Sequence, residues 1–460
     1  MRACLFALFL LVPQEDLARN LIERLGSDDP ETRAKAAAEL VRLGEKGVPQ
    51  LRKALEDPDA EVRGRAHEVL KRIARLDSRG FKIFGDRTEA KRNAVARGCG
   101  EVRTEDAVLN ALKWLSRHQS AEGSWKVQGF VGECQKIADY AKGEKCKPNP
   151  GHDDFDSGVT GLAILAFLGS GYSHLSKDTY DGLCFGDVVR KGIQWIMAHQ
   201  DPNGCLGSRA AQKYMYNHAI CTLALAEAYA LTGSNLFKAQ AQKAVDFTVA
   251  AQNPGQGWRY SFRCGDNDTS VTFWSALALR VAWHTGFEVP EATFGGAKAW
   301  LDEVTEGTYR RVGYTHRGSG RINFGGRDNF DHHETLTAMG GFLRILMDQS
   351  RENAMLGSGM EILLRDKPKW DENAIDFTYW NAGTLAMFQF DGPDGLKWKR
   401  WNEEMKNALV PNQRRAADGC RAGSWDPVDH WGGEGGRVYG TALNALTLES
   451  YYRYRLVPRP

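Results

Sequence analysis

Hydrophobic and polar residues follow the 3.6-residue period of amphipathic helices along most of the chain, and from residue 104 to 456 two kinds of segment take turns. Segments of the first kind are amphipathic and stop at a turn containing Gln, Gly and an aromatic residue, as in AVLNALKWLSRHQSAEGSW, residues 107–125. Segments of the second kind are apolar all round and rich in Ala and Gly, as in DSGVTGLAILAFLGSGY, residues 156–172. A helix that is apolar on every side needs burial on every side, so the second kind is predicted to form an inner layer.

The alternation recurs about six times, at roughly 47–64 residues per outer and inner pair. Inner helices with many small residues can lie close together, sheathed by the amphipathic ones. The pattern therefore predicts an all-α fold, an (α/α)6 toroid over residues 104–456, in which the helix from Arg437 packs beside the helix from Asp156. An open solenoid of the same pairs would satisfy the same period.

A shorter repeat, of about 30 residues, covers residues 16–76. LIERLGSDDPETRAKAAAEL, from Leu21, aligns with LRKALEDPDAEVRGRAHEVL, from Leu51. Each unit is predicted to be helix, turn, helix, with Asp as the cap and Pro at the helix start. The pattern resembles a HEAT repeat, which implies a surface for a protein partner; a solvated charged helical hairpin is the alternative. Residues 77–103, rich in Lys, Arg and Gly, are predicted to be the linker.

The first residues indicate where the protein acts. Residues 1–13 hold one Arg and then a short apolar run before a polar segment, which predicts an export signal and a periplasmic or extracellular protein. A buried or frayed first helix is the alternative. No apolar run approaches the roughly 20 residues that a membrane span needs. With 60 basic and 58 acidic residues, the charge balance argues against nucleic-acid binding.

Cysteine spacing gives little support to a metal site. The chain contains no C-x-x-C motif. Cys134 and Cys146 share one polar loop and are the predicted disulfide pair. The run DNFDHHET holds adjacent His residues, which point in different directions from a helix or strand. The sequence therefore predicts no metal and no cofactor.

The turn from Gln119 to Trp125 resembles the QW motifs of squalene and hopene cyclases, and GGRVYGTALNALTLESYYRY, residues 435–454, resembles the closing helix of cyclase and prenyltransferase repeats. This resemblance implies a closed ring whose cavity binds or transforms an isoprenoid-like apolar molecule, in the manner of a terpene cyclase or mutase. Two motifs depart from the family pattern. Ser270 stands where prenyltransferases have a zinc-binding Cys, and Asn267 stands where cyclases have the protonating Asp. Whether the protein is an enzyme therefore stays open. The alternative is a non-catalytic exported module that presents its surfaces to a protein, glycan or lipid.

Consecutive inner helices of such a ring run parallel, so their N-terminal ends gather at one rim, where helix dipoles favour anionic groups. The candidate catalytic residues at this rim are Asp268, Asp266 and Asp156. The candidate ligand-binding residues are Trp274, His333, Glu334, Asp376, Tyr379, Trp380 and Tyr439. An Asp at a helix start is most often a plain cap, and buried aromatic residues most often serve packing.

Overall fold

The computed structural model describes residues 14–43, 47–78, 83–85, 87, 102–136, 146, 151–317, 334–348, 351, 354–372 and 374–457. The chain divides into one unit spanning Met1–Lys82 and another spanning Ile83–Pro460. The predicted signal, residues 1–13, and most of the predicted linker lie outside the described residues. Among the helices in the described ranges, none is long and apolar enough to cross a membrane.

The first unit is a small helical bundle with its own apolar core. Its helices are α1 (Gln14–Leu25), α2 (Pro30–Leu43), α3 (Val48–Lys53) and α4 (Ala60–Ser78), with a 3-10 turn, η2 (Ala54–Glu56). Asp29 accepts the backbone N–H of Thr32 at 2.8 Å and so caps α2. Arg33 donates to the Asp28 carbonyl at 2.7 Å, and Arg63, thirty residues later, donates to the equivalent Pro58 carbonyl at 2.9 Å. The two predicted repeats therefore use the same residues for the same contacts.

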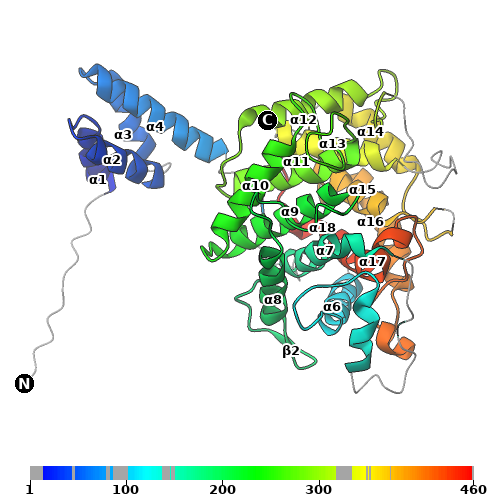
Figure 1. Ribbon diagram of the computed structural model, residues 1–460. Coiled ribbons are helices and arrows are strands. Elements are labelled where there is room, and N and C mark those ends of the chain that lie inside the picture. Colours follow the sequence, from blue (N-terminus) through cyan, green and yellow to red (C-terminus); the bar gives the residue numbers. More distant parts are fainter. Residues whose placement is uncertain are drawn as a thin grey trace, which may run out of the picture. The chain divides into compact units, whose positions relative to one another are not determined.

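The second unit is a ring of paired helices (Figure 1). The inner helices are α7 (Asp156–Gly169), α9 (Tyr214–Thr232), α11 (Thr269–His284), α13 (Thr335–Asp348), α15 (Phe377–Asp391) and α17 (Gly432–Leu448). The outer helices are α6 (Val102–Arg117), α8 (Phe185–Ala198), α10 (Lys238–Ala251), α12 (Glu291–Val304), α14 (Ala354–Arg365) and α16 (Leu396–Leu409). Each inner helix packs on the next, and α17 packs on α7. The ring is therefore closed, which confirms the toroid and excludes the open solenoid.

Shorter elements connect these helices. Among the described residues they are the hairpin of β1 (Thr179–Tyr180) and β2 (Leu183–Cys184), the short helix α18 (Ser450–Arg453), and the 3-10 segments η3 (Gly129–Lys136), η5 (Asp153–Phe155), η6 (Val410–Asn412) and η7 (Ala416–Arg421). The two strands pair antiparallel. These connections leave the two layers of helices as the body of the unit.

The turns after the outer helices repeat one set of contacts. The Gln119 side-chain amide donates to the carbonyl of Gly123 in its own turn and to that of Val188 on the next outer helix, both at 2.9 Å. Gln200, Gln252 and Gln413 make the same two kinds of bond. Each Gln thus links its turn to the neighbouring outer helix, so the repeat in the sequence is a repeat of contacts between pairs.

The aromatic residue of these turns folds back as predicted. The Trp125 indole donates to the Leu115 carbonyl at 2.8 Å, and its backbone N–H donates to Thr160 of the inner helix at 2.9 Å. Trp258 and Trp425 repeat both bonds. The buried Trp therefore fastens the outer helix to the inner one.

Side chains fill the ring along its inner helices. Residues 159–169 of α7 and 269–282 of α11 are all buried, including those that face the ring axis. The end of the ring at the C-termini of the inner helices is also covered. There Glu227 accepts hydrogen bonds from Arg453 at 2.6 Å, Tyr454 at 2.8 Å and Arg87 at 3.2 Å, with all four side chains buried. The opposite end, where the inner helices begin, carries the candidate site.

Candidate functional site

Hydrogen bonds between neighbouring inner helices place their N-terminal ends together. Asn217 at the start of α9 accepts the backbone N–H of Gly158 in α7 at 3.1 Å. Thr335 at the start of α13 donates to Asp376, the residue that precedes α15, at 3.1 Å. The predicted rim of inner-helix N-termini is thus present.

Asp268 is the most deeply placed acid of the predicted catalytic set. One carboxylate oxygen, Oδ1, accepts the backbone N–H of Val271 and the hydroxyl of Ser270, both at 2.8 Å, so Asp268 caps α11. The other oxygen, Oδ2, is buried and has no hydrogen-bond partner among the residues that the structure describes, although Arg259 Nε lies 4.0 Å away. Burial raises the pKa of Asp268 to about 6, against the opposing effect of the two hydrogen bonds and of Arg259.

Polar aromatic residues surround this carboxylate. The Tyr216 hydroxyl, from the first turn of α9, lies 2.5 Å from the Ser270 hydroxyl. The hydroxyls of Tyr260 and Tyr314 bond to each other, and the Arg259 guanidinium lies 5.2 Å from the centre of the Tyr260 ring. We call Asp268, Arg259, Tyr216, Tyr260 and Tyr314 the Asp268 cluster. It presents hydroxyls, a guanidinium and a carboxylate from two inner helices and two loops.

The other predicted acids have different surroundings. Asp266 is exposed and pairs with Arg259 at 3.3 Å, so it borders the Asp268 cluster. Asp156 begins α7 and accepts the backbone N–H of Val127 at 2.7 Å. Burial raises the pKa of Asp156 to about 6. Because α9 packs between α7 and α11, the structure does not bring Asp156 into the Asp268 cluster.

A second carboxylate pair lies between α15 and α17. Asp376 caps α15 by accepting the backbone N–H of Tyr379 at 2.8 Å. Asp429 accepts the Tyr439 hydroxyl at 3.0 Å, and that hydroxyl also lies 2.8 Å from Thr378. Burial, and then the nearby charge of Asp376, raise the pKa of Asp429 to about 8. These contacts tie the last two inner helices together.

The remaining predicted ligand-binding residues are mostly engaged in packing. The Tyr379 hydroxyl donates to the Asp366 carbonyl at 2.7 Å, beside the outer helix α14, and Trp380 is fully buried. Trp274 of α11 is 9% exposed. Glu334 pairs with Arg311 at 2.8 Å. His333 lies outside the described residues.

Sequence analysis did not select Arg259, Tyr216, Tyr260, Tyr314 or Asp429. All except Tyr216 lie in loops, outside the helical period that guided the choice. A local sequence signal could have identified two of them: Arg259 and Tyr260 directly follow Trp258 in a Gln-Gly-Trp turn. The backbone N–H of Trp258 donates to Thr272, so the residues after this Trp lie beside the next inner helix, α11.

A family model of HEAT repeats matches residues 18–79 and confirms the predicted repeat of the first unit. The amino-acid sequence matches none of the curated proteins with which it was compared.

Solved structures resemble the second unit. The GH76A alpha-1,6-mannanase of Salegentibacter sp. HEL1_6 has a TM-score of 0.51 at 9% identity, over 76% of this chain and 98% of that one. A GH76 alpha-mannanase of Bacteroides thetaiotaomicron has a TM-score of 0.47 at 9% identity, over 78% and 98%. A Clostridium perfringens alpha-amylase has a TM-score of 0.46 at 12% identity, over 75% and 98%. At such identities these likenesses concern the fold, an α/α toroid. They lend no support to the squalene cyclase or prenyltransferase family itself.

Proposed function

We propose that the toroid binds a carbohydrate at the Asp268 cluster. The observation that carries the proposal is Asp268 Oδ2, a buried carboxylate oxygen for which the described part of the chain supplies no hydrogen-bond partner. Leaving such an acceptor unpaired costs about 1–3 kcal/mol, and more for a charged group, so a ligand hydroxyl that donates to it would bind favourably. Sugars supply closely spaced hydroxyls together with apolar ring faces that stack on aromatic side chains.

The surroundings of Asp268 support a polar ligand over an apolar one. Tyr216 and Tyr260 are half-buried residues that place hydroxyl groups and aromatic rings in the Asp268 cluster. Arg259 adds hydrogen-bond donors at the same place. An isoprenoid-like ligand, expected from the resemblance to cyclases, would need an apolar cavity along the inner helices, and there residues 159–169 of α7 and 269–282 of α11 are all buried. The structurally similar GH76A protein of Salegentibacter is named as an alpha-1,6-mannanase, which agrees with this choice of ligand.

A glycan-cleaving activity is the second candidate, and it is favoured by one observation. Asp266 and Asp268 lie around the same guanidinium, that of Arg259, at 3.3 and 4.0 Å. Glycoside hydrolysis uses two carboxyl groups, one protonated and one ionised. The pKa of Asp268, raised to about 6 by burial, suits the protonated partner. The exposed Asp266 is proposed as the second carboxyl group.

Export, predicted from residues 1–13, would bring this rim into contact with extracellular glycans. The HEAT unit is proposed to hold a protein partner, because stacked HEAT helices form extended binding surfaces. Both statements remain predictions beside the carbohydrate proposal.

The proposal is tested by isothermal titration with α-1,6-linked mannooligosaccharides and with maltooligosaccharides. Binding to the wild type is expected to weaken about tenfold or more in Asp268→Asn, which removes the charge and keeps the helix cap. The control is Asp29→Asn, which alters an N-cap Asp in the HEAT unit and should leave binding unchanged. Release of reducing ends, lost in Asp266→Asn and Asp268→Asn, would extend the proposal to catalysis.

Two outcomes would contradict the carbohydrate proposal. One is the absence of binding to a wider panel of glycans. The other is an isoprenoid or other lipid that co-purifies in stoichiometric amount and is lost in Trp274→Ala, because that result would place the ligand against the inner helices.

A further inference from the structure

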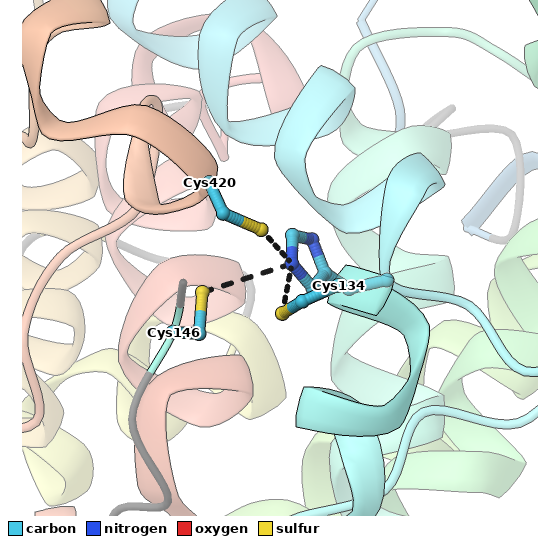
Figure 2. Close-up of side chains that lie close together, drawn as sticks. Cys134, Cys146 and Cys420 are labelled. Carbon is cyan, nitrogen blue, oxygen red and sulfur yellow. Dashed lines mark hydrogen bonds between the residues drawn. The ribbon is translucent and has the colours of Figure 1, made fainter. Parts of the chain in front are cut away.

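Four potential metal ligands meet between the first and last repeats of the ring. The His118 Nε2 atom, just after α6, lies 3.2 Å from the Cys134 sulfur in η3 and 3.2 Å from the Cys420 sulfur in η7. The Cys146 sulfur lies 3.7 Å from the same nitrogen. Figure 2 shows the sulfurs of Cys134, Cys146 and Cys420 directed toward the same imidazole nitrogen. All four residues are buried, and their ligand atoms lie within 4.8 Å of one another.

The imidazole is held with its free nitrogen toward the thiols. His118 Nδ1 donates to the Trp114 carbonyl at 2.7 Å, and because a carbonyl only accepts, this nitrogen carries the proton. Nε2 of the neutral ring is then the lone-pair atom that faces the sulfurs. The ring also stacks on Trp114 at 4.1 Å, and the Trp114 indole donates to the Cys420 carbonyl at 3.0 Å. Metal-binding His residues commonly have such a second hydrogen bond, which fixes tautomer and orientation.

The next repeat shows what this turn looks like without thiols. His199 stacks on Trp195 at 4.0 Å and its Nδ1 lies 2.8 Å from the Trp195 carbonyl, as in the first repeat. His199, however, is exposed, and among the described residues it belongs to no group of potential metal ligands. The Trp–His stack therefore belongs to the fold of the turn. The three cysteines are specific to the turn that contains His118, and they come from three separate segments of the chain.

We propose that His118, Cys134, Cys146 and Cys420 bind one structural Zn²⁺ ion. Three sulfurs and one imidazole nitrogen complete a tetrahedron, and structural zinc sites of this Cys₃His type have no open position. Zinc bonds of about 2.3 Å to sulfur place the sulfurs about 3.8 Å apart, so ligand atoms that lie within 4.8 Å of one another need only a small rearrangement. Binding requires no redox step: the thiols release their protons to solvent as the zinc–sulfur bonds form.

The ion would fasten the ring where its two ends meet. His118 follows the first outer helix, and Cys420 follows the last outer helix, α16, 302 residues later. A cross-link over so long a stretch removes much of the conformational freedom of the unfolded chain. The proposed zinc is therefore a closing element of the toroid, and it is independent of the carbohydrate site at the Asp268 cluster.

The test is elemental analysis of the full chain, purified under reducing conditions and dialysed. About one zinc per chain is expected. Cys420→Ser and Cys134→Ser should lose the zinc, whereas His199→Ala, the matched residue of the next repeat, should retain it. In case a Cys variant does not fold, the wild type is tested too: titration of its thiols with a mercurial reagent should release the zinc, and a strong chelator should lower the melting temperature.

Two results would overturn the proposal. The first is a wild type free of zinc, or one that holds iron in its place. The second is a Cys134–Cys146 disulfide, found by mass spectrometry in the folded protein as first isolated without reductant. Zinc retained in both Cys→Ser variants would place the ion elsewhere and would also overturn it.

Discussion

The side-chain amide of Gln413 donates to the carbonyl of Ala107 at 2.7 Å, although 306 residues separate them. The same amide also donates to the Gly423 carbonyl of its own turn at 2.8 Å. At Gln200 the two bonds go to Gly204 and to Gln240 of the next outer helix. The seam between the last and first repeats is therefore built like an internal junction.

Gln413→Ala is expected to lower the free energy of unfolding by about 1–2 kcal/mol, because two partly buried carbonyls lose their donor. Gln200→Ala, which breaks the same bonds within the ring, should cost a similar amount. Urea unfolding followed by circular dichroism measures both. A loss in Gln200→Ala with none in Gln413→Ala would mean that the ring is open in solution.

Gly423→Ala is expected to destabilise the protein by about 2 kcal/mol more than Gly286→Ala. Both glycines have positive φ, +93° and +95°, so both substitutions strain the backbone. Only at Gly423 would the new Cβ lie 2.2 Å from a carbonyl oxygen, that of Asn110 on α6; at Gly286 nothing lies within 4 Å. The melting temperatures of the two variants provide the measurement. Equal decreases in melting temperature would show that the seam between the last and first repeats accommodates the added Cβ atom.

Glu227→Gln is expected to lower the free energy of unfolding by about 3–5 kcal/mol, since it leaves Arg87 and Arg453 buried without their carboxylate. Burial alone would raise the pKa of Glu227, but Arg453 and Arg87 bring it below its ordinary value, so the group is ionised. The comparison is Asp187→Asn, which breaks an exposed pair with Arg190 and should cost about 0–1 kcal/mol. Similar costs in denaturant unfolding would show that the buried cluster does not hold the end of the ring.

Asp268 should make the stability of the protein fall as pH rises from about 4 to about 6. Its pKa is raised from 3.8 to about 6 in the folded state, so the folded protein binds more protons in this window than the unfolded chain does. Asp268→Asn removes this contribution. Measured against the variant, the wild type should lose up to about 3 kcal/mol between pH 4 and pH 6. Parallel pH curves for the two proteins would show that the pKa is not raised.

The sequence was sufficient to predict the helix pairs, because each helix shows its own hydrophobic period and ends at residues that terminate helices. Asp268 caps α11, as an Asp at a helix start commonly does, whereas Asp156 does not cap α7, and α17 closes on α7. Closure was predictable because small residues let the inner helices approach: at Gly161 a Cβ would lie 2.9 Å from Ile220 of the next inner helix. The 3.6-residue period therefore predicts which layer each helix belongs to, the order of the helices and which neighbouring helices pack together.

Side-chain direction within a layer was not predictable. Tyr379 follows its cap by three residues in sequence, yet its hydroxyl turns to the outer layer. A helix that is apolar all round has no polar face to mark which side is inward, so the period does not decide this.

The thiol cluster was also missed, because the sequence pattern does not bring His118 and Cys420 together. The expectation of no metal stays a prediction, which the proposed zinc site opposes. The ligands come from a helix end, two short segments and a turn far along the chain, and no local spacing links them. Cys134 and Cys146 were rightly placed near each other, but as a disulfide. Their third thiol partner is supplied only by the closure of the ring.

The repeated junction has a consequence for the connectivity of the fold. The first and last helices of the ring have no direct chain connection. Tyr451, which follows α17, nevertheless donates its hydroxyl to Glu105 in α6 at 2.8 Å, so the two ends of the ring lie close together. The contacts across the gap between the two ends match those at every other junction formed by a Gln turn. A circularly permuted chain, joined across this gap and opened at another connection, would therefore rebuild the same toroid with a different order of repeats.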